Sequence, residues 1–168
     1  MIRSYTLAVA AVMTAVTGFG AWAADPLPTE TFKVLPAALA VEAAQAAMAQ
    51  CKTQGYNVTV TVVDRTGATK LQIVADNGNR IGPDLSRRKA YTSVLLRVST
   101  GDYKARVATP GAFNPGVFDA VLTTEQGGLP IKVGNETIGG IGASGAPGGE
   151  KDEACAAAGL AKISDRLN

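Results

Sequence analysis

Thr137-Ile-Gly-Gly-Ile-Gly-Ala-Ser-Gly-Ala-Pro-Gly-Gly-Glu-Lys-Asp-Glu-Ala-Cys155 is the stretch of sequence that decides the fold. Its apolar beginning predicts a strand. Its acidic and alanine-rich end predicts the start of a helix, because acidic side chains suit the positive end of a helix dipole. Glycine at this density indicates backbone that adopts positive φ or lets another group approach closely. We therefore expect this segment to expose its main chain to a ligand.

Two β-hairpins are predicted, and the deciding stretch supplies the last strand of the second one. In that hairpin, Leu129 to Val133 and Glu136 to Ala143 pair around the turn Gly134-Asn135. The earlier hairpin pairs Val58 to Asp64, which is β-branched almost throughout, with Thr69 to Ala75.

Helices are predicted for most of the remaining chain, over about 35–54, from 84 or 86 to 98, from 100 or 102 to before 109, and over 150–167. In the second of them, Asp84 or Ser86 would cap the N-terminus, and an apolar stripe would include Val94 and Leu95. A short strand is expected at Val121. The order helix, hairpin, helices, hairpin, helix predicts an α+β fold, an antiparallel sheet with flanking helices.

The N-terminus has the pattern of a signal peptide over residues 1–23. Arg3 precedes an apolar stretch, and Ala21-Trp22-Ala23 fits the small-residue cleavage site. The apolar stretch is too short for a stable membrane span. We therefore expect a periplasmic or secreted protein without a membrane span after cleavage, with an extended lead-in over 24–34 and a single domain over 35–168.

Composition excludes several classes of function. The formal net charge is only +2, which gives no electrostatic basis for binding nucleic acid. The sequence contains no histidine, so Ser-His-Asp, Cys-His and zincin sites are excluded, as is histidine-ligated haem. The two cysteines, Cys51 and Cys155, form either one disulfide in an oxidising compartment or two buried small apolar residues.

Three local patterns have both a functional and a structural interpretation. Asp152 and Glu153 are candidates for a metal site, although compensation of the helix dipole already explains acidic residues there. The cluster Arg87-Arg88-Lys89 at a helix start is either a solvated face or a recess for an acidic ligand. The spacing of Gly140, Gly142 and Gly145 matches the dinucleotide fingerprint, but only one helix follows, so we reject that interpretation.

Several segments together carry a family resemblance. They are Ser86-Arg-Arg-Lys-Ala-Tyr-Thr92, Gly128-Leu-Pro-Ile131, the run from Ile138 to Cys155, and Val62-Val-Asp-Arg-Thr-Gly67. In these segments the chain resembles the GlcG/HbpS haem-binding-like family, whose domain also forms the C-terminal part of PduO-type cobalamin adenosyltransferases. The resemblance covers roughly residues 35–167. It implies a profilin- or PAS-like sandwich, assembly into dimers or higher oligomers, and a pocket for haem or another tetrapyrrole.

The resemblance also implies where the ligand would bind, between the lysine-containing helix and the glycine-rich segment. The expected ligand-binding residues are Arg88, Lys89, Tyr91, Thr92, Gly139, Gly140, Gly142, Ser144 and Gly145. Without histidine, an axial ligand to haem iron would have to be Tyr91, Tyr103, Met48, a cysteine or a weak oxygen donor. The segment Ala75-Asp-Asn-Gly-Asn-Arg80 departs from the sequence that similar proteins usually have there.

The sequence therefore supports one leading hypothesis and two alternatives. The first is an exported protein that binds a small, partly apolar, acidic ligand, with a tetrapyrrole as the main candidate. The second is a small enzyme that acts on an oxo or hydroxy acid, with Glu125, Asp152 or Glu153 as its general acid or base. The third is an accessory subunit of an exported oxidoreductase, without a ligand of its own.

Overall fold

Four antiparallel strands form a single sheet in the order β2-β1-β4-β3. The computed structural model describes residues 30–167, so the predicted signal peptide and the first part of the lead-in lie outside the described residues. The strands are β1 (Thr59–Asp64), β2 (Thr69–Val74), β3 (Gly128–Val133) and β4 (Glu136–Ser144). Both predicted hairpins are confirmed, and β4 lies between β1 and β3.

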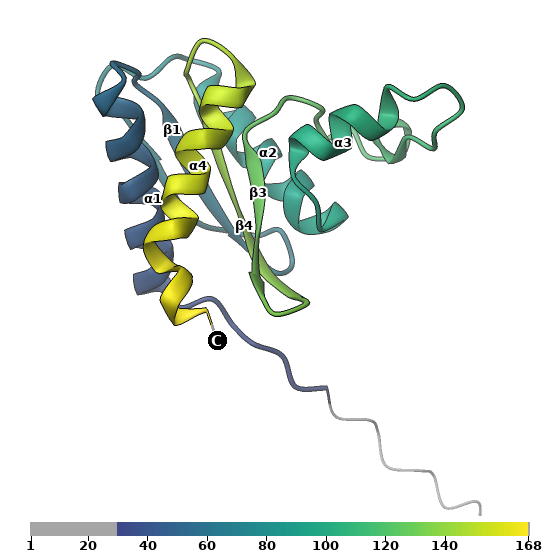
Figure 1. The fold of residues 1–168 in the computed structure, drawn as a ribbon, viewed down its shortest axis with the longest axis horizontal. Coiled ribbons are helices and arrows are strands. Elements are labelled where there is room, and N and C mark those ends of the chain that lie inside the picture. The colour runs from purple at the N-terminus through teal and green to yellow at the C-terminus, as the bar shows by residue number, and fades with distance from the viewer. Residues whose placement is uncertain (1–29, 168) are drawn as a thin grey trace, which may run out of the picture. The chain divides into compact units, whose positions relative to one another are not determined.

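Helices cover both faces of this sheet, which confirms the predicted α+β fold. They are α1 (Ala37–Thr53), α2 (Gly82–Leu96), α3 (Thr100–Val107) and α4 (Gly149–Ile163), with short 3₁₀ turns at Pro115–Val117 and Ser164–Arg166. Figure 1 shows α1 and α4 side by side against the sheet, while α3 stands apart from it. None of the helices in residues 30–167 has the length and apolarity needed to cross a lipid bilayer.

The face covered by α1 and α4 holds the main hydrophobic core. In α1 the buried alanines Ala40, Ala43, Ala44 and Ala47 follow the i, i+3, i+4, i+7 spacing of a helix face. Small side chains let the two helices approach closely. A Cβ added at Gly159 of α4 would lie only 2.4 Å from the carbonyl oxygen of Ala43. Val58, just before β1, and strand side chains complete the core, and the strand residues are Val60, Val62, Ile131, Ile138 and Ile141.

The face covered by α2 is packed in a different way. The buried residues of α2 are mostly polar, and they include Ser86, Lys89, Thr92 and Ser93. They lie against glycines of the sheet, because only a residue without a side chain leaves room for the helix backbone. A Cβ added at Gly142 would lie 2.2 Å from the carbonyl oxygen of Ser86.

Two predicted local features are wrong, and a third is only partly correct. The helix α2 begins before Asp84 and Ser86, so neither caps it, and Pro83 occupies its first turn instead. The predicted apolar stripe is only partly the buried face, since Val94 is buried whereas Leu95 is 51 % exposed. No strand forms at Val121, which lies in irregular chain after α3.

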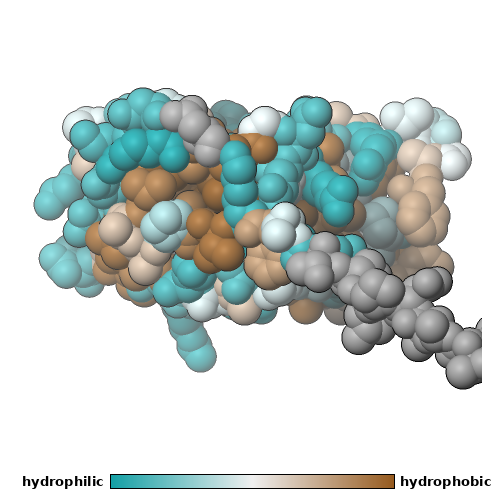
Figure 2. Space-filling view, turned by 90° about the horizontal axis from the view of Figure 1, so that it is seen from below, coloured by the Kyte–Doolittle hydropathy of each residue, from teal (hydrophilic) through white to brown (hydrophobic). Residues whose placement is uncertain are grey.

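Two parts of the surface are unusually apolar. Phe113, Val117 and Phe118 follow α3 and are 70 %, 75 % and 80 % exposed, and the two phenylalanine rings stack with their centroids 5.9 Å apart. Phe32 and Val34, just before α1, are 53 % and 62 % exposed. Figure 2 shows hydrophobic side chains gathered between hydrophilic ones on the face seen from below.

Candidate functional site

The side chains of α2 that the sequence assigns to a ligand are already bonded within the chain. Arg88 donates three hydrogen bonds, of 3.0 to 3.1 Å, to the carbonyl oxygens of residues 120–122. Tyr91 donates its hydroxyl to Asp119 Oδ2 at 2.9 Å, and Thr92 Oγ1 accepts a hydrogen bond from Thr123 N at 3.0 Å. These residues therefore anchor the irregular segment after α3 to α2.

The Tyr91–Asp119 contact has an electrostatic consequence. The hydrogen bond to the Asp119 carboxylate, together with partial burial, raises the pKa of the Tyr91 phenol, because the phenolate would lose the bond and face a negative charge. Tyr91 is therefore a neutral donor that holds the segment in place.

The predicted glycines serve mainly for close packing. A Cβ added at Gly140 would lie 2.5 Å from the carbonyl oxygen of Ala90 in α2, and one added at Gly139 would lie 2.6 Å from that of Val63 in β1. Gly142 lies beneath Ser86 of α2, and Ser144 is buried beside these glycines. Gly145 has a φ of +139° and ends the strand. The expectation that Gly140 and Gly142 face a ligand is therefore corrected, because the α2 backbone occupies that space.

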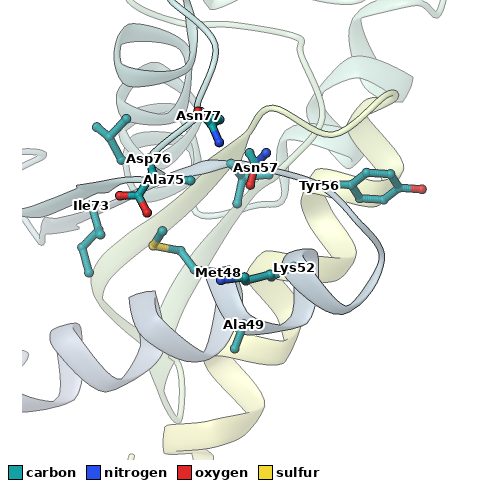
Figure 3. A pocket seen from close by; sticks show the side chains of 11 residues that line it. Met48, Ala49, Lys52, Tyr56, Asn57, Ile73, Ala75, Asp76 and Asn77 are labelled. Carbon is teal, nitrogen blue, oxygen red and sulfur yellow. The ribbon is translucent and has the colours of Figure 1, made fainter.

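A hollow lined by a thioether lies at the end of the sheet where β1 begins and β4 ends, close to Gly145, and we call it the Met48 hollow. It has a volume of about 430 Å³ between the last turns of α1, the start of β1 and the chain after β2. Figure 3 shows Met48 pointing from α1 toward Ala75 and Asp76, whereas Tyr56 points away from this group. Its lining residues include Met48, Lys52, Tyr56, Asn57, Val58, Ile73, Val74, Ala75, Asp76 and Asn77.

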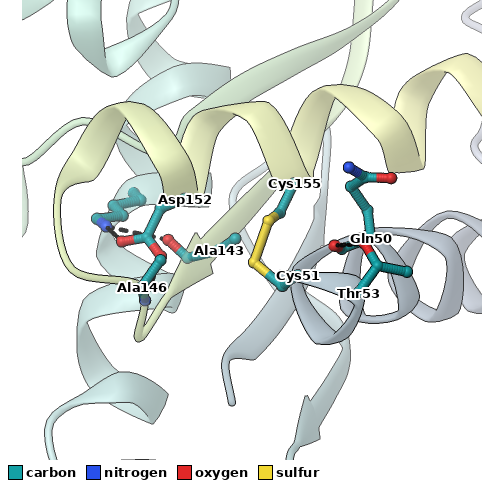
Figure 4. The surroundings of a disulfide bond; sticks show 8 residues. Gln50, Cys51, Thr53, Ala143, Ala146, Asp152 and Cys155 are labelled. Atoms are coloured by element: carbon teal, nitrogen blue, oxygen red, sulfur yellow. Dashed lines mark hydrogen bonds and ion pairs between the residues drawn. A yellow bond between two sulfur atoms is a disulfide. The ribbon is translucent and has the colours of Figure 1, made fainter. Parts of the chain in front are cut away.

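A disulfide secures the helix that carries Met48. Cys51 and Cys155 are joined with an S–S distance of 2.05 Å, and both residues are fully buried between α1 and α4 (Figure 4). Of the two alternatives for the cysteines, the structure shows the disulfide. Lys151 of α4 lies 5.5 Å from the centroid of the Tyr56 ring, a second contact that links α4 to the edge of the Met48 hollow. The hollow is therefore bordered by a covalently fixed helix.

Lys89 and Asp152 form a buried ion pair beside this region. Lys89 Nζ lies 2.7 Å from Asp152 Oδ2 and also donates to the carbonyl oxygen of Ala143 at 3.0 Å, and the two charged residues are 2 % and 4 % exposed. Asp152 Oδ1 accepts a hydrogen bond from Ala146 N at 2.9 Å (Figure 4). Burial raises the pKa of Asp152, although the ammonium of Lys89 and the backbone hydrogen bonds act in the opposite direction.

The acidic residues expected in a metal site or in catalysis are not grouped. Asp152 is neutralised by Lys89, and Glu125 is exposed. Glu153 Oε2 is buried without a hydrogen-bond partner, but within residues 30–167 no three His, Cys, Asp or Glu side chains are placed to hold a metal ion. The described acidic residues therefore show no arrangement specific to metal binding or to acid–base catalysis.

Comparison with known proteins shows to which family the chain belongs. The family described as "Haem degrading protein HbpS-like" matches residues 35–161. The chain belongs to the HbpS-like family. No curated protein sequence matches it at a significant level.

Solved structures with the same fold agree with this assignment. HbpS is 31 % identical to this HbpS-like chain, over 83 % of this chain and 96 % of its own, with a TM-score of 0.74. The protein ORFY of Klebsiella pneumoniae is 27 % identical over 83 % and 98 %, with a TM-score of 0.73. PduOC, solved as a haem complex, is 24 % identical over 78 % and 96 %, with a TM-score of 0.72, and this likeness concerns the fold alone.

The side chains of this HbpS-like chain can be tested for their fit to haem. The disulfide removes both cysteines as iron ligands, and Tyr91 and Tyr103 donate their hydroxyls to neighbouring side chains at 2.9 and 2.6 Å. Met48 is the remaining soft donor among those the sequence suggested, and it lines a hollow. The apolar side chains of Ile73 and Val74 in β2 suit a macrocycle, and Lys52 suits a propionate, so the residues fit the group.

Sequence reasoning found Met48 but not the hollow around it. Lys52, Asn57 and Asn77 come from three separate segments, and no spacing in the sequence brings them together. One signal was present, since the segment from Ala75 to Arg80 is where the chain departs from similar proteins, and its first three residues line the Met48 hollow.

Proposed function

We propose that this HbpS-like chain binds haem or a related tetrapyrrole in the Met48 hollow. The observation that carries the proposal is the position of Met48, a thioether at the edge of the core that lines a hollow of about 430 Å³ in a protein of a haem-related family. Bound haem would supply a redox-active or oxygen-binding iron, which this chain lacks by itself.

The role of each residue follows from its chemistry. The thioether of Met48 would ligate the iron. The ammonium of Lys52 would pair with a propionate, while Ile73 and Val74 would contact the macrocycle. Asp76 places a carboxylate on the opposite wall, so the propionates would lie on the side of Lys52.

A haem titration followed by visible absorbance tests the proposal. The wild-type chain is expected to give a Soret band that saturates at one haem per chain. Met48→Leu keeps the volume and removes the sulfur, so the position of the band should change and the affinity should fall. Lys52→Ala should weaken binding about fivefold, as expected for an exposed ion pair, while the control Lys104→Ala should not.

Two outcomes would overturn the proposal. A flat titration at micromolar haem would exclude the tetrapyrrole, and a Soret band unchanged in both Met48→Leu and Lys52→Ala would exclude this hollow.

We also propose that the protein is exported and that it assembles into a homo-oligomer. The buried disulfide supports export, since such bonds persist in oxidising compartments. The exposed side chains of Phe113, Val117 and Phe118 support assembly, because an apolar cluster of this kind marks an interaction surface. Analytical ultracentrifugation of wild type and of Phe113→Ser/Phe118→Ser tests the assembly, and a wild type that sediments as a monomer at all concentrations would refute it.

A further inference from the structure

A second concave surface lies where the chain enters α1, and we call it the lead-in groove. It consists of two adjoining hollows of about 300 and 320 Å³ that share Val34 and Ile138. The first is walled by Phe32 and Leu35, and the second by Leu39, Val133 and Leu167. Both hollows therefore have an apolar floor, while the second also has Lys33 and Arg166 in its lining, and Arg166 is paired with Glu42.

One end of the groove carries two cations. Arg65 and Lys70 line the first hollow, and the guanidinium carbon of Arg65 lies 4.0 Å from the centroid of the Phe32 ring. This stacking holds Arg65 beside the apolar wall while its donors remain exposed.

The carboxylate at the same end is occupied by its own turn. Asp64 Oδ1 accepts hydrogen bonds from Thr66 N at 2.8 Å, from Thr66 Oγ1 at 2.7 Å and from Ala68 N at 3.1 Å. Burial would raise the pKa of Asp64, but these hydrogen bonds and the nearby Lys70 outweigh it and lower the pKa. This end of the groove has two cationic side chains, and its one carboxylate is already hydrogen-bonded within its own turn. It can therefore bind an anion.

We propose that the lead-in groove binds a small amphipathic anion, with a carboxylate or sulfonate head at Arg65 and Lys70 and an alkyl or aromatic body along Val34 and Ile138. Two hollows in line suit an elongated body, and the neighbouring cations Arg65 and Lys70 in the first hollow suit a single head group. The lining contains no thioether, thiol or phenol, so the groove offers no soft ligand to an iron. The inference is independent of the haem proposal.

The head-group arm of the test uses dodecanoate in calorimetry and 1-anilinonaphthalene-8-sulfonate in fluorescence, with the full chain. Both probes are expected to bind, and Arg65→Ala/Lys70→Ala should weaken both about tenfold, as expected when charged hydrogen bonds are lost. The matched control Arg80→Ala/Lys104→Ala removes the same charges elsewhere and should leave the affinities unchanged. Equal affinities in the two double variants would overturn the inference.

The apolar arm uses Val34→Asp, which places a carboxylate in the middle of the groove at a residue that is 62 % exposed, so the fold should tolerate it. Binding of both probes should be lost, whereas Val41→Asp, at a partly exposed site of α1, should bind normally. If Val34→Asp instead converts a dimer into a monomer in sedimentation, a second copy of the chain covers the groove and the inference is wrong.

A competition arm separates the groove from the Met48 hollow. Saturating haem should leave the dodecanoate affinity unchanged, and so should Met48→Leu. Competitive loss of dodecanoate on adding haem, together with weaker haem binding in Arg65→Ala/Lys70→Ala, would make the groove the tetrapyrrole site and overturn the inference of a separate ligand. Failure of the haem proposal alone would leave dodecanoate binding intact.

Discussion

Compared with the face covered by α1 and α4, the face covered by α2 buries few apolar side chains. The alternation of β1 shows the contrast, because Val60 and Val62 belong to the apolar core whereas Thr59 and Thr61 are buried on the opposite face. On the α2 face, Thr61 Oγ1 and Ser86 Oγ are 2.7 Å apart, within hydrogen-bonding distance. The same sheet is thus apolar on one face and polar on the other.

The difference shows that two kinds of interaction hold the helices against the sheet. Apolar burial is non-directional, so on the face of α1 and α4 the close contact at Gly159 and the disulfide add the specific constraint. Hydrogen bonds and glycine-mediated backbone contact are directional or short in range, so they fix where α2 lies. The helix α2 then determines the path of the segment after α3 through Arg88, Tyr91 and Thr92.

The largest expected effect comes from the apolar face. Removing the disulfide with Cys51→Ala/Cys155→Ala should lower the free energy of unfolding by about 4–5 kcal/mol, because the bond closes a loop of about 100 residues in the unfolded chain. Denaturant unfolding with and without a reductant measures the effect. If the free energy of unfolding of the wild type does not change on reduction, the disulfide does not stabilise the apolar face.

The next effect concerns the polar face. Lys89→Ala should cost about 3–5 kcal/mol, because it leaves Asp152 buried without a partner. The double change Lys89→Met/Asp152→Leu should recover most of the loss. As a control, Arg87→Ala breaks the exposed pair with Asp84 and should cost less than about 1 kcal/mol. Equal losses for Lys89→Ala and Arg87→Ala in urea unfolding would contradict the buried-pair account.

Close approach of α2 to the sheet gives a smaller effect. Gly142→Ala places a Cβ 2.2 Å from the carbonyl oxygen of Ser86, so α2 must shift at a cost of about 1–3 kcal/mol. Gly101→Ala in α3 meets only the side-chain ends of Gln126 and Glu153, at 3.1 Å, and should change stability by no more than about 1 kcal/mol. If the two substitutions have the same effect on thermal unfolding, the glycine contact does not fix α2.

The smallest effect is pH-dependent. Tyr91→Phe should cost about 1 kcal/mol at neutral pH, because the hydrogen bond to Asp119 is lost. Since the folded-state pKa of Tyr91 is raised above 10.0, the contribution is fully present below pH 10.0 and is lost as the pH rises through the folded value. Unfolding of wild type and variant, measured from pH 7 to 11, should therefore converge at high pH. A gap that stays constant would contradict the phenol–carboxylate contact.

Much of the fold could be predicted because its signals are local. The β-branched run of β1 and the turn at Gly134 each act on neighbouring residues, and both lie where expected. The start of α2 could not be predicted, because its buried face is polar and an apolar stripe is the usual sign of a helix face.

The predicted site shows the same limit. The sequence assigned ligand binding to Arg88, Lys89, Tyr91 and Thr92. In the structure their hydrogen-bond partners lie between 28 and 63 positions away along the chain. From the sequence alone, a cationic side chain can be assigned either to a ligand or to a carbonyl oxygen of the same chain. Only the folded chain shows which of these lies near it.

The sequence by itself determined the class of fold, the two hairpins and the family, because each depends on residue types in a fixed local order. The tertiary structure decided that the glycines pack against α2, that Lys89 is buried against Asp152, and that Met48 lines a hollow with Lys52 and Asn77. These outcomes depend on which distant backbone segments come into contact, and that contact is set by packing of the whole core, not by the neighbours of any one residue.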